Sequence, residues 1–211
     1  MCLMKSINDC RLYGILDTGY CAPAAMPAML AAMVRNGVDI VQLRAKDLPQ
    51  DRILELAREL HPLSRAAGVP FIINDHPALA AEARVEGAHV GQDDMSVIEA
   101  RRLAGAGKII GLSTHSLFQA DAAAAQQPDY IGFGPLFATP TKPDYTPIGT
   151  QDIAEVHRRV HLPVFCIGGI KRENLREVLA AGAKRVVIVS GILKAFEPDS
   201  YTRECAAMLR A

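Results

Sequence analysis

The stretch Asp129-Tyr-Ile-Gly-Phe-Gly-Pro-Leu-Phe-Ala-Thr-Pro-Thr-Lys142 joins a buried strand to a polar segment that follows it directly. Its first part, Tyr130 to Phe133, is a short apolar run, and Pro135 ends the regular strand. Glycine within a strand allows a ligand or another backbone to approach closely. The two threonine hydroxyls and the ammonium at the end of the stretch suit an anion such as phosphate. An ordinary buried strand followed by a polar loop has the same pattern, so the neighbouring strands decide between the two.

The same unit recurs along the chain: a short aliphatic run, a polar or glycine-rich turn, and an amphipathic segment rich in Ala and Leu. The apolar runs are continuous, which is typical of strands buried on both faces of a parallel sheet. The predicted strands are Arg11–Leu16, Ile40–Leu43, Pro70–Asn74, Ala88–Val90, Ile109–Ser113, Tyr130–Phe133, Val164–Ile167 and Arg185–Val189. The predicted helices are Pro27–Asn36, Gln50–Ala67, Pro77–Glu86, Ser96–Leu103, Ser116–Gln126, Thr150–Val160, Arg172–Ala181 and Ser200–Leu209. We expect left-handed helix caps at Gly37, Gly68, Gly87, Gly105 and Gly182.

Eight strand–helix units in 211 residues, with no break in composition, predict an α/β fold, a (β/α)8 TIM barrel. We expect a single domain over residues 1–211, with the barrel over about residues 11–209. An open doubly wound sheet is the alternative, because periodicity does not show whether a sheet closes. Both folds place ligands at the carboxyl ends of the strands, so the residues at these ends indicate the function.

Composition narrows the kind of partner. The chain has 23 Lys and Arg against 23 Asp and Glu, a formal net charge of zero, whereas nucleic-acid binding usually needs a basic excess. The five cysteines include no Cys-x-x-Cys spacing, which argues against a disulfide framework or a zinc site. The N-terminus has no apolar signal region, and no stretch is long enough to span a bilayer. We therefore expect a cytoplasmic protein that acts on small molecules, without nucleic acid or membrane as a partner; a homo-oligomer is left open.

The end of the second strand carries Gln42, Arg44 and Lys46, which alternate and so point to the same side of an extended backbone. Two cations and an amide on one face suit a diphosphate and a heterocycle. A solvated rim with surface ion pairs is the alternative. Ser113, at the end of the fifth strand, can donate a hydrogen bond to a phosphate oxygen. Together with Lys142, these residues predict one anion site.

A carboxylate follows each of two neighbouring strands: Asp75 after the third, and Asp93 or Asp94 after the fourth. Mg²⁺ favours one or two carboxylates together with phosphate oxygens and water. Such a pair beside a cationic diphosphate site therefore predicts magnesium. Helix capping is the alternative for each aspartate taken alone, at the helices that begin near Pro77 and Ser96.

The seventh strand ends in Cys166-Ile-Gly168-Gly169-Ile170 and the eighth in Val189-Ser190-Gly191. Barrels often bind a phosphate with the loops after strands seven and eight, where glycine leaves backbone N–H groups accessible. Tight turns alone would also explain these glycines. Two anion sites at one barrel mouth indicate a transfer reaction between two phosphorylated substrates. The chain lacks a Gly-x-Ser-x-Gly elbow, which disfavours a hydrolase triad.

With these residues in view, the sequence resembles the thiamine phosphate synthase family from Leu12 to Leu193. The motifs that carry the resemblance are Gln42-x-Arg44-x-Lys46, Asn74-Asp75, Gly91-Gln92-x-Asp94, Gly111-x-Ser113-x-His115, Thr139-Pro-Thr141-Lys142, Gly168-Gly169-Ile170 and Val189-Ser190. The resemblance implies a (β/α)8 barrel that joins 4-amino-2-methyl-5-hydroxymethylpyrimidine diphosphate to a thiazole phosphate, giving thiamine monophosphate and pyrophosphate. It also implies a dissociative, magnesium-assisted substitution, in which diphosphate departs and the thiazole nitrogen attacks a stabilised pyrimidine cation.

The resemblance further assigns residues to each substrate. The pyrimidine diphosphate would be held by Gln42, Arg44, Lys46, Asn74, Ser113 and Lys142, of which Arg44, Lys46, Ser113 and Lys142 would act in catalysis. The thiazole phosphate would be held by Thr139, Thr141, Gly169, Val189 and Ser190, and the metal Mg²⁺ by Asp75 and Asp94.

Two other functions fit the same barrel. A thiazole tautomerase-like paralogue would share the barrel and the phosphate site but lack the diphosphate and metal residues, with His115 as its proton-transfer residue. A non-catalytic protein that binds a phosphate ligand would keep the pocket alone. Because the charged set is complete in this sequence, we favour the synthase.

Overall fold

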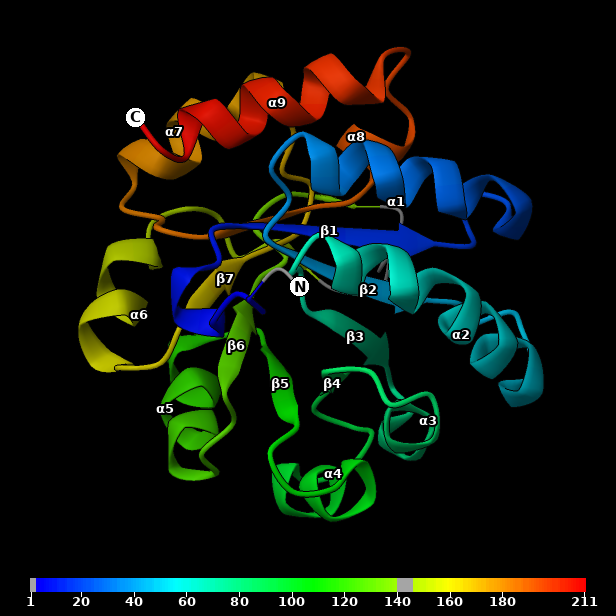
Figure 1. The fold of residues 1–211 in the computed structure, drawn as a ribbon. Coiled ribbons are helices and arrows are strands. Elements are labelled where there is room, and N and C mark those ends of the chain that lie inside the picture. The colour runs from blue at the N-terminus through cyan, green and yellow to red at the C-terminus, as the bar shows by residue number, and fades with distance from the viewer. Residues whose placement is uncertain (1–2, 140–145) are drawn as a thin grey trace.

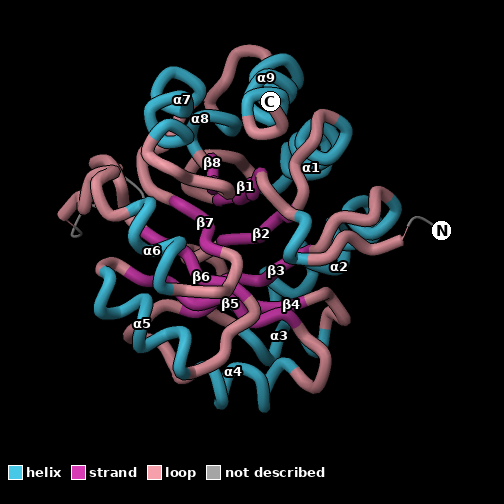
Figure 2. Tube along the Cα trace, turned by 90° about the vertical axis from the view of Figure 1, so that its left-hand side faces the viewer, coloured by secondary structure: helices cyan, strands magenta, loops and turns pink. Residues whose placement is uncertain are grey.

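Eight parallel strands close into a barrel in which each strand pairs with the next along the chain, and β8 pairs with β1 (Figures 1 and 2). The computed structural model describes residues 3–139 and 146–211. The strands are β1 (Leu12–Asp17), β2 (Ile40–Arg44), β3 (Phe71–Asn74), β4 (Gly87–Val90), β5 (Ile109–Thr114), β6 (Tyr130–Phe133), β7 (Val164–Cys166) and β8 (Val186–Ile188). The closure confirms the predicted (β/α)8 TIM barrel and excludes the open doubly wound sheet.

Helices surround the barrel on the outside (Figure 2). They are α1 (Met26–Arg35), α2 (Gln50–Ala66), α3 (Pro77–Glu82), α4 (Val97–Ala104), α5 (Leu117–Ala125), α6 (Ile153–Arg159), α7 (Arg172–Ala180), α8 (Ser190–Leu193) and α9 (Pro198–Met208), with short 3-10 turns at Ile7–Asp9 and Pro23–Ala25. All eight predicted helices are present, although α3 ends before the predicted Glu86 and α6 begins after the predicted Thr150. The additional α8 has four residues, too few for a periodic pattern in the sequence. The last helix, α9, packs against α1 and α7 and so completes the outer ring (Figure 1).

The strands are buried on both faces because two separate groups of apolar side chains pack against them. The larger group lies between the barrel and its helices, and the smaller group fills the barrel itself. Within the barrel the rings of Tyr13, Tyr130 and Phe165 pack edge to face, with centroids 5.3, 5.4 and 5.8 Å apart. Burial of these three rings stabilises the centre of the fold and makes it a packed core rather than a pore.

Four of the five predicted glycine caps are confirmed by a positive φ: Gly37, Gly68, Gly105 and Gly182. The prediction for Gly87 is wrong, because this residue is the first of β4. A Cβ atom there would lie 2.0 Å from the carbonyl oxygen of Ile109 on the adjacent strand. The left-handed position after α3 belongs instead to Arg84, with φ of 57°. Gly87 is therefore required by close strand packing and not by a turn.

Asp39 binds several segments of the chain at the amino ends of the strands. The predicted site lies at the opposite ends. Asp39 is 1% exposed. One of its oxygens accepts hydrogen bonds from the backbone N–H groups of Arg11 and Leu12, both at 2.9 Å. The other accepts from Lys5 at 2.5 Å and from Arg210 at 2.9 Å. Burial alone would raise the pKa of Asp39, but the hydrogen bonds from Leu12, Lys5 and Arg11 outweigh it and lower the pKa.

The cysteines that the structure describes are free thiols in the interior: Cys10, Cys21, Cys166 and Cys205. Burial raises the pKa of Cys10, Cys166 and Cys205 to about 12. These three thiols therefore stay protonated at neutral pH and are poor nucleophiles. Across the two described ranges, none of the helices is long and apolar enough to cross a membrane.

Candidate active site

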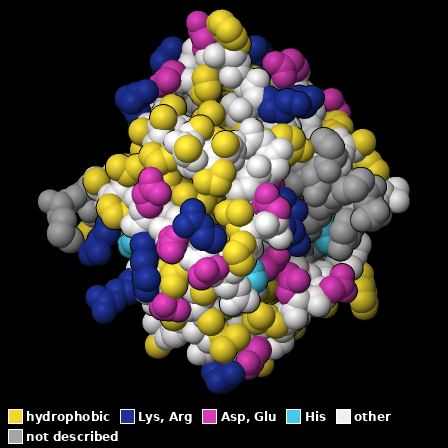
Figure 3. Space-filling view, turned by 90° about the vertical axis from the view of Figure 1, so that its right-hand side faces the viewer, with side chains coloured by type: hydrophobic (Ala, Val, Ile, Leu, Met, Phe, Trp, Pro, Cys, Tyr) yellow, Lys and Arg dark blue, Asp and Glu magenta, His cyan; other side chains and the backbone are white. Residues whose placement is uncertain are grey.

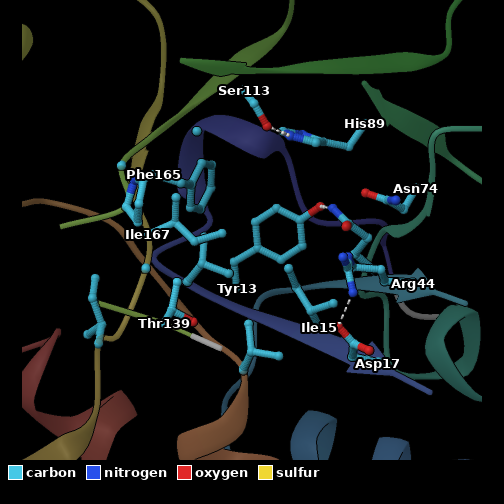
Figure 4. A pocket seen from close by; sticks show the side chains of 18 of the residues that line it. Tyr13, Ile15, Asp17, Arg44, Asn74, His89, Ser113, Thr139, Phe165 and Ile167 are labelled. Atoms are coloured by element: carbon cyan, nitrogen blue, oxygen red, sulfur yellow. Dashed lines mark hydrogen bonds and ion pairs between the residues drawn. The ribbon is translucent and has the colours of Figure 1, made fainter. Parts of the chain in front are cut away.

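A pocket of about 930 Å³, including its opening to solvent, lies at the carboxyl ends of the strands (Figure 4). Every strand, or the residue after it, contributes to its wall. The predicted site residues that line it are Gln42, Arg44, Asn74, Ser113, Thr139, Gly169, Val189 and Ser190. Lys46, Asp75 and Asp94 are grouped beside it, next to Asn74. The predicted residues Thr141 and Lys142 lie outside the described residues.

The guanidinium of Arg44 is held against the wall of this pocket by Asp17. Its Nη1 atom lies 2.6 Å from Oδ2 of Asp17, an aspartate at the end of β1 that is 2% exposed (Figure 4). The second oxygen of Asp17 accepts a hydrogen bond from the backbone N–H of Gly19 at 2.9 Å. Asp17 is absent from the predicted site residues, although its position at a strand end was a visible signal. Since both of its oxygens are bound, the carboxylate fixes the direction in which Arg44 faces.

Lys46 and two aspartates form a compact charged group. The ammonium of Lys46 lies 3.0 Å from Oδ2 of Asp75. Burial raises the pKa of Asp75 above its usual value, and the negative charge of the nearby Asp94 raises it further, although the hydrogen bond from Lys46 lowers it in part. Ionisation of Asp75 is thus more costly here than in a free aspartate. A cation bound between the two carboxylates would relieve this cost.

Neither aspartate of this group caps a helix. The residue before α3 is His76, and no side chain caps that helix. Helix α4 is capped by the hydroxyl of Ser96, which accepts from the N–H of Glu99 at 3.2 Å. Asp94 instead accepts from the N–H of Gly91 at 2.6 Å. Helix capping, the alternative explanation for these carboxylates, is therefore not what holds them in place.

The donor set fits a hard cation that takes only part of its ligands from the protein. In residues 3–139 and 146–211, no three His, Cys, Asp or Glu side chains come together as a metal site. Asp75 and Asp94 could hold Mg²⁺, which commonly completes its coordination with phosphate oxygens and water. The face of the molecule at this end of the strands shows Lys and Arg side chains next to Asp and Glu side chains across its middle (Figure 3).

A buried network of hydrogen bonds runs through the floor of the pocket, from β2 to β5. Nε2 of Gln42 donates to the hydroxyl of Tyr13 at 2.7 Å, and this hydroxyl lies 2.9 Å from that of Tyr130. The Tyr130 hydroxyl lies 3.0 Å from Nδ1 of His89. Nε2 of His89 lies 2.9 Å from Oγ of Ser113 (Figure 4). Tyr13, Tyr130 and His89 are absent from the predicted site residues. Each is followed in its own strand by glycine or an apolar residue, and only closure of the barrel brings the three together.

Gly111, two residues before Ser113 on β5, makes room for this network. A Cβ atom at this position would lie 2.1 Å from Cζ of Tyr130 and 2.5 Å from Nδ1 of His89. Any other residue would push one of these rings aside. Steric exclusion by these two rings therefore explains why the Gly111-x-Ser113 motif begins with glycine.

The glycines after β7 serve close packing between two loops. Gly168 and Gly169 have φ of 97° and 66°. A Cβ atom on Gly168 would lie 2.4 Å from Cα of Pro135, and one on Gly169 would lie 2.6 Å from Cβ of Phe137. The N–H of Phe137 also donates to the carbonyl of Gly168 at 3.0 Å. This packing brings Thr139 and Gly169 to the wall of one pocket; phosphate binding by these residues stays a prediction.

His115 is fixed by the backbone at the rim of the pocket. Its Nδ1 lies 2.5 Å from the carbonyl oxygen of Gly134, and its backbone N–H donates to Oε1 of Gln119 at 2.7 Å. Since a carbonyl oxygen only accepts, Nδ1 carries a hydrogen. His115 therefore connects the start of α5 to the backbone after β6.

The chain is similar in sequence and in structure to one family of known proteins. Residues 12–192 match the family model described as "Thiamine monophosphate synthase". A thiamine-phosphate synthase of Chloroflexus aurantiacus is 39% identical, over 96% of this chain and 94% of its own length. A thiamine-phosphate synthase of Shouchella clausii is 42% identical, over 94% of this chain and 96% of its own length. Among solved structures, a thiamine phosphate pyrophosphorylase from Pyrococcus furiosus superposes with a TM-score of 0.88 at 28% identity, covering 97% of both chains.

Proposed function

The chain belongs to the thiamine monophosphate synthase family and is a transferase, and on this premise we propose that it joins 4-amino-2-methyl-5-hydroxymethylpyrimidine diphosphate to a thiazole phosphate. The products are thiamine monophosphate and pyrophosphate. The observation that carries the proposal is the group of Lys46, Asp75 and Asp94 beside a pocket that also contains Arg44. A diphosphate with a divalent cation needs this combination of cations and carboxylates.

The leaving diphosphate would be bound by several side chains at this side of the pocket. Arg44, held by Asp17, presents its guanidinium at the pocket wall, and Lys46 adds a second positive charge nearby. Ser113 can donate a hydrogen bond, and Lys142 is assigned to the same diphosphate from its motif in the sequence. When bound at Asp75 and Asp94, Mg²⁺ would neutralise negative charge on the departing group.

The walls of the pocket suit a dissociative substitution. Departure of diphosphate leaves a pyrimidine cation, and the nitrogen of the thiazole then forms the new C–N bond. Ile15, Phe165 and Val187 line the pocket next to the polar residues, so they limit the access of water, which would otherwise trap the cation. The buried thiols of Cys10, Cys166 and Cys205 have raised pKa values, which supports a mechanism without a cysteine nucleophile.

The second substrate is assigned to the other loops at the mouth. Thr139, Gly169 and Ser190 line the pocket together with Val189, and Thr141 is assigned with them from its motif. Backbone N–H groups near glycines and a serine hydroxyl suit the phosphate of the thiazole. The tautomerase-like and non-catalytic alternatives have no use for the charged group of Lys46, Asp75 and Asp94, so we do not favour them.

The test is direct synthesis. The purified protein is incubated with both precursors and Mg²⁺, with and without a chelator, and pyrophosphate and thiamine monophosphate are measured. We expect both products, and their loss with the chelator. Asp94→Ala and Lys142→Ala should each lower turnover by about 10²-fold or more, whereas Asp93→Ala, which removes the adjacent carboxylate, should stay near the wild-type rate. Failure to release pyrophosphate, or an undiminished rate in Asp94→Ala, would contradict the proposal.

We also propose that the protein acts in the cytoplasm, with residues 1–211 forming one domain. The unbridged interior thiols support a reducing compartment, and contacts between α9 and α1 join the two ends of the chain in one barrel. Cell fractionation and limited proteolysis test the two statements. A periplasmic location or a stable proteolytic fragment would contradict them.

A further inference from the structure

The buried network has a direction, which follows from the chemistry of its first member. Nε2 of Gln42 carries hydrogens and can only donate. It donates to the hydroxyl oxygen of Tyr13, so the hydrogen of Tyr13 is directed at its other partner, the oxygen of Tyr130. The hydrogen of Tyr130 is then directed at Nδ1 of His89. Each donor along the network thus determines the next.

The direction determines the tautomer of His89 and the role of Ser113. Because Nδ1 of His89 accepts, the ring carries its hydrogen on Nε2, which donates to Oγ of Ser113. The hydrogen of Ser113 is then directed toward the pocket that the residue lines. At the opposite end, the amide group of Gln42 uses Nε2 inside the network and keeps its carbonyl oxygen as an acceptor.

Burial keeps this pattern intact. Tyr13 and Tyr130 are at most 1% exposed and Gln42 is 3% exposed, so an unpaired donor or acceptor among them would be costly. Burial also raises the pKa of both tyrosines, so their hydroxyls keep their hydrogens. If both nitrogens of His89 donated, the hydrogen of Tyr130 would lose its acceptor. The network therefore has one favourable arrangement with Gln42 as its first donor.

We propose that Tyr13, Tyr130 and His89 are positioning residues that make Gln42 a hydrogen-bond acceptor and Ser113 a hydrogen-bond donor toward the bound ring. The assignment of that ring as an aminopyrimidine rests on the proposed function. An amino group is a donor and a ring nitrogen is an acceptor, which matches the two ends of the network. An analogue with an oxygen in place of the amino group meets the acceptor of Gln42 with a second acceptor, and we expect it to bind about tenfold or more weakly.

The tautomer of His89 is measured in the ¹⁵N-labelled protein by long-range ¹H–¹⁵N correlation at neutral pH. The signals of this ring are identified by their loss in His89→Gln. We expect hydrogen on Nε2 alone. Hydrogen on Nδ1 alone, or on both nitrogens, overturns the proposal.

Reversal of the network is the sharper test. In Gln42→Glu a carboxylate replaces the donor, so Tyr13 has to donate to it and every later hydrogen bond reverses. We expect hydrogen on Nδ1 of His89 in this variant, although residue 42 is connected to the imidazole of His89 only through Tyr13 and Tyr130. Adding Tyr13→Phe cuts the network and should abolish the reversal. The proposal fails if Gln42→Glu folds and keeps the wild-type tautomer.

A second pair of variants covers the case in which Gln42→Glu does not fold. Tyr130→Phe keeps the aromatic ring in its edge-to-face contacts but removes the hydroxyl between Tyr13 and His89. We expect it to leave a mixture of His89 tautomers, and a single unchanged tautomer would overturn the proposal. Tyr201→Phe is the matched control, because it removes a tyrosine hydroxyl that instead accepts from the N–H of Arg172; here the tautomer should not change.

These measurements separate the two proposals. If His89 carries the expected tautomer and Gln42→Glu reverses it, but the protein makes no thiamine monophosphate, the proposed function fails and the positioning role stands. If product forms but the tautomer differs, only the positioning role fails.

Discussion

We predict that a divalent cation bound by Asp75 and Asp94 displaces Lys46, whose ammonium lies 3.0 Å from Oδ2 of Asp75. The lysine side chain is 54% exposed, so this ion pair is worth about 1 kcal/mol at most. Lys46→Met keeps much of the side-chain volume and removes the charge. We therefore expect Mg²⁺ to bind the substrate-free variant about fivefold more tightly, since 1.4 kcal/mol corresponds to about tenfold. Turnover should change in the opposite direction and fall by about 10²-fold, because the diphosphate loses a cation.

Isothermal titration of the substrate-free protein with Mg²⁺ measures the first effect, and steady-state pyrophosphate release measures the second. Lys46→Arg is the matched control, because it keeps the positive charge and should leave Mg²⁺ affinity close to that of the wild type. Asp94→Asn in the same titration should abolish binding. Weaker or unchanged Mg²⁺ binding in Lys46→Met would refute the reasoning, because it would show that Lys46 does not occupy the place of the cation.

Three further predictions concern single contacts. Asp17→Asn should lower kcat/KM for the pyrimidine diphosphate about tenfold, because Arg44 loses its charged partner; unchanged kinetics would contradict a positioning role for Asp17. Asp39→Asn should lower the free energy of unfolding by about 2–4 kcal/mol at neutral pH, measured by urea denaturation. Folding lowers the pKa of Asp39, so its ionised form stabilises the fold above the unfolded pKa, and this stabilisation is lost as the pH falls through the folded pKa. If the variant and the wild type still differed in free energy of unfolding in strong acid, the result would contradict this explanation. Gly87→Ala should lower the thermal midpoint or prevent folding, because its Cβ would lie 2.0 Å from the carbonyl oxygen of Ile109; a wild-type midpoint would contradict the close strand packing.

The strands could be predicted closely from the sequence because each is a continuous apolar run with a glycine or polar turn at its end. The prediction of Tyr130–Phe133 matches β6, and the prediction of Arg185–Val189 exceeds β8 by one residue at each end. Burial on both faces of the sheet is a local property of the residues, so it is visible without the fold. Closure of the barrel is not a local property, and only the pairing of β8 with β1 in the structure shows it.

The strand-end residues were predictable as a set, but their partners were not. Position after a strand was enough to place Arg44 and Asp75 at the mouth. The pairing of Arg44 with Asp17, and of Asp75 with Lys46, depends on how neighbouring strands are staggered, which the sequence does not show. Gly87 was assigned to a turn because glycine after a helix has the same appearance whether it permits a positive φ or the close approach of a strand.

The interior of the barrel was the least predictable part. Tyr130 and His89 are one strand apart on either side of β5, and nothing in either strand indicates that their side chains meet. Their contact depends on the space that Gly111 leaves. A residue without a side chain gives no pattern of its own, so the reason for it emerges only from what surrounds it.

The missing side chain of Gly111 has a consequence for the evolution of the pocket. Because the two rings occupy the space of its absent side chain, an alanine or serine can be accepted there only if the residue at position 89 or 130 becomes smaller. We therefore expect these three positions to change together among related barrels. The same exchange is a route to altered specificity by design, because it redistributes side-chain volume among the three residues without filling the space twice.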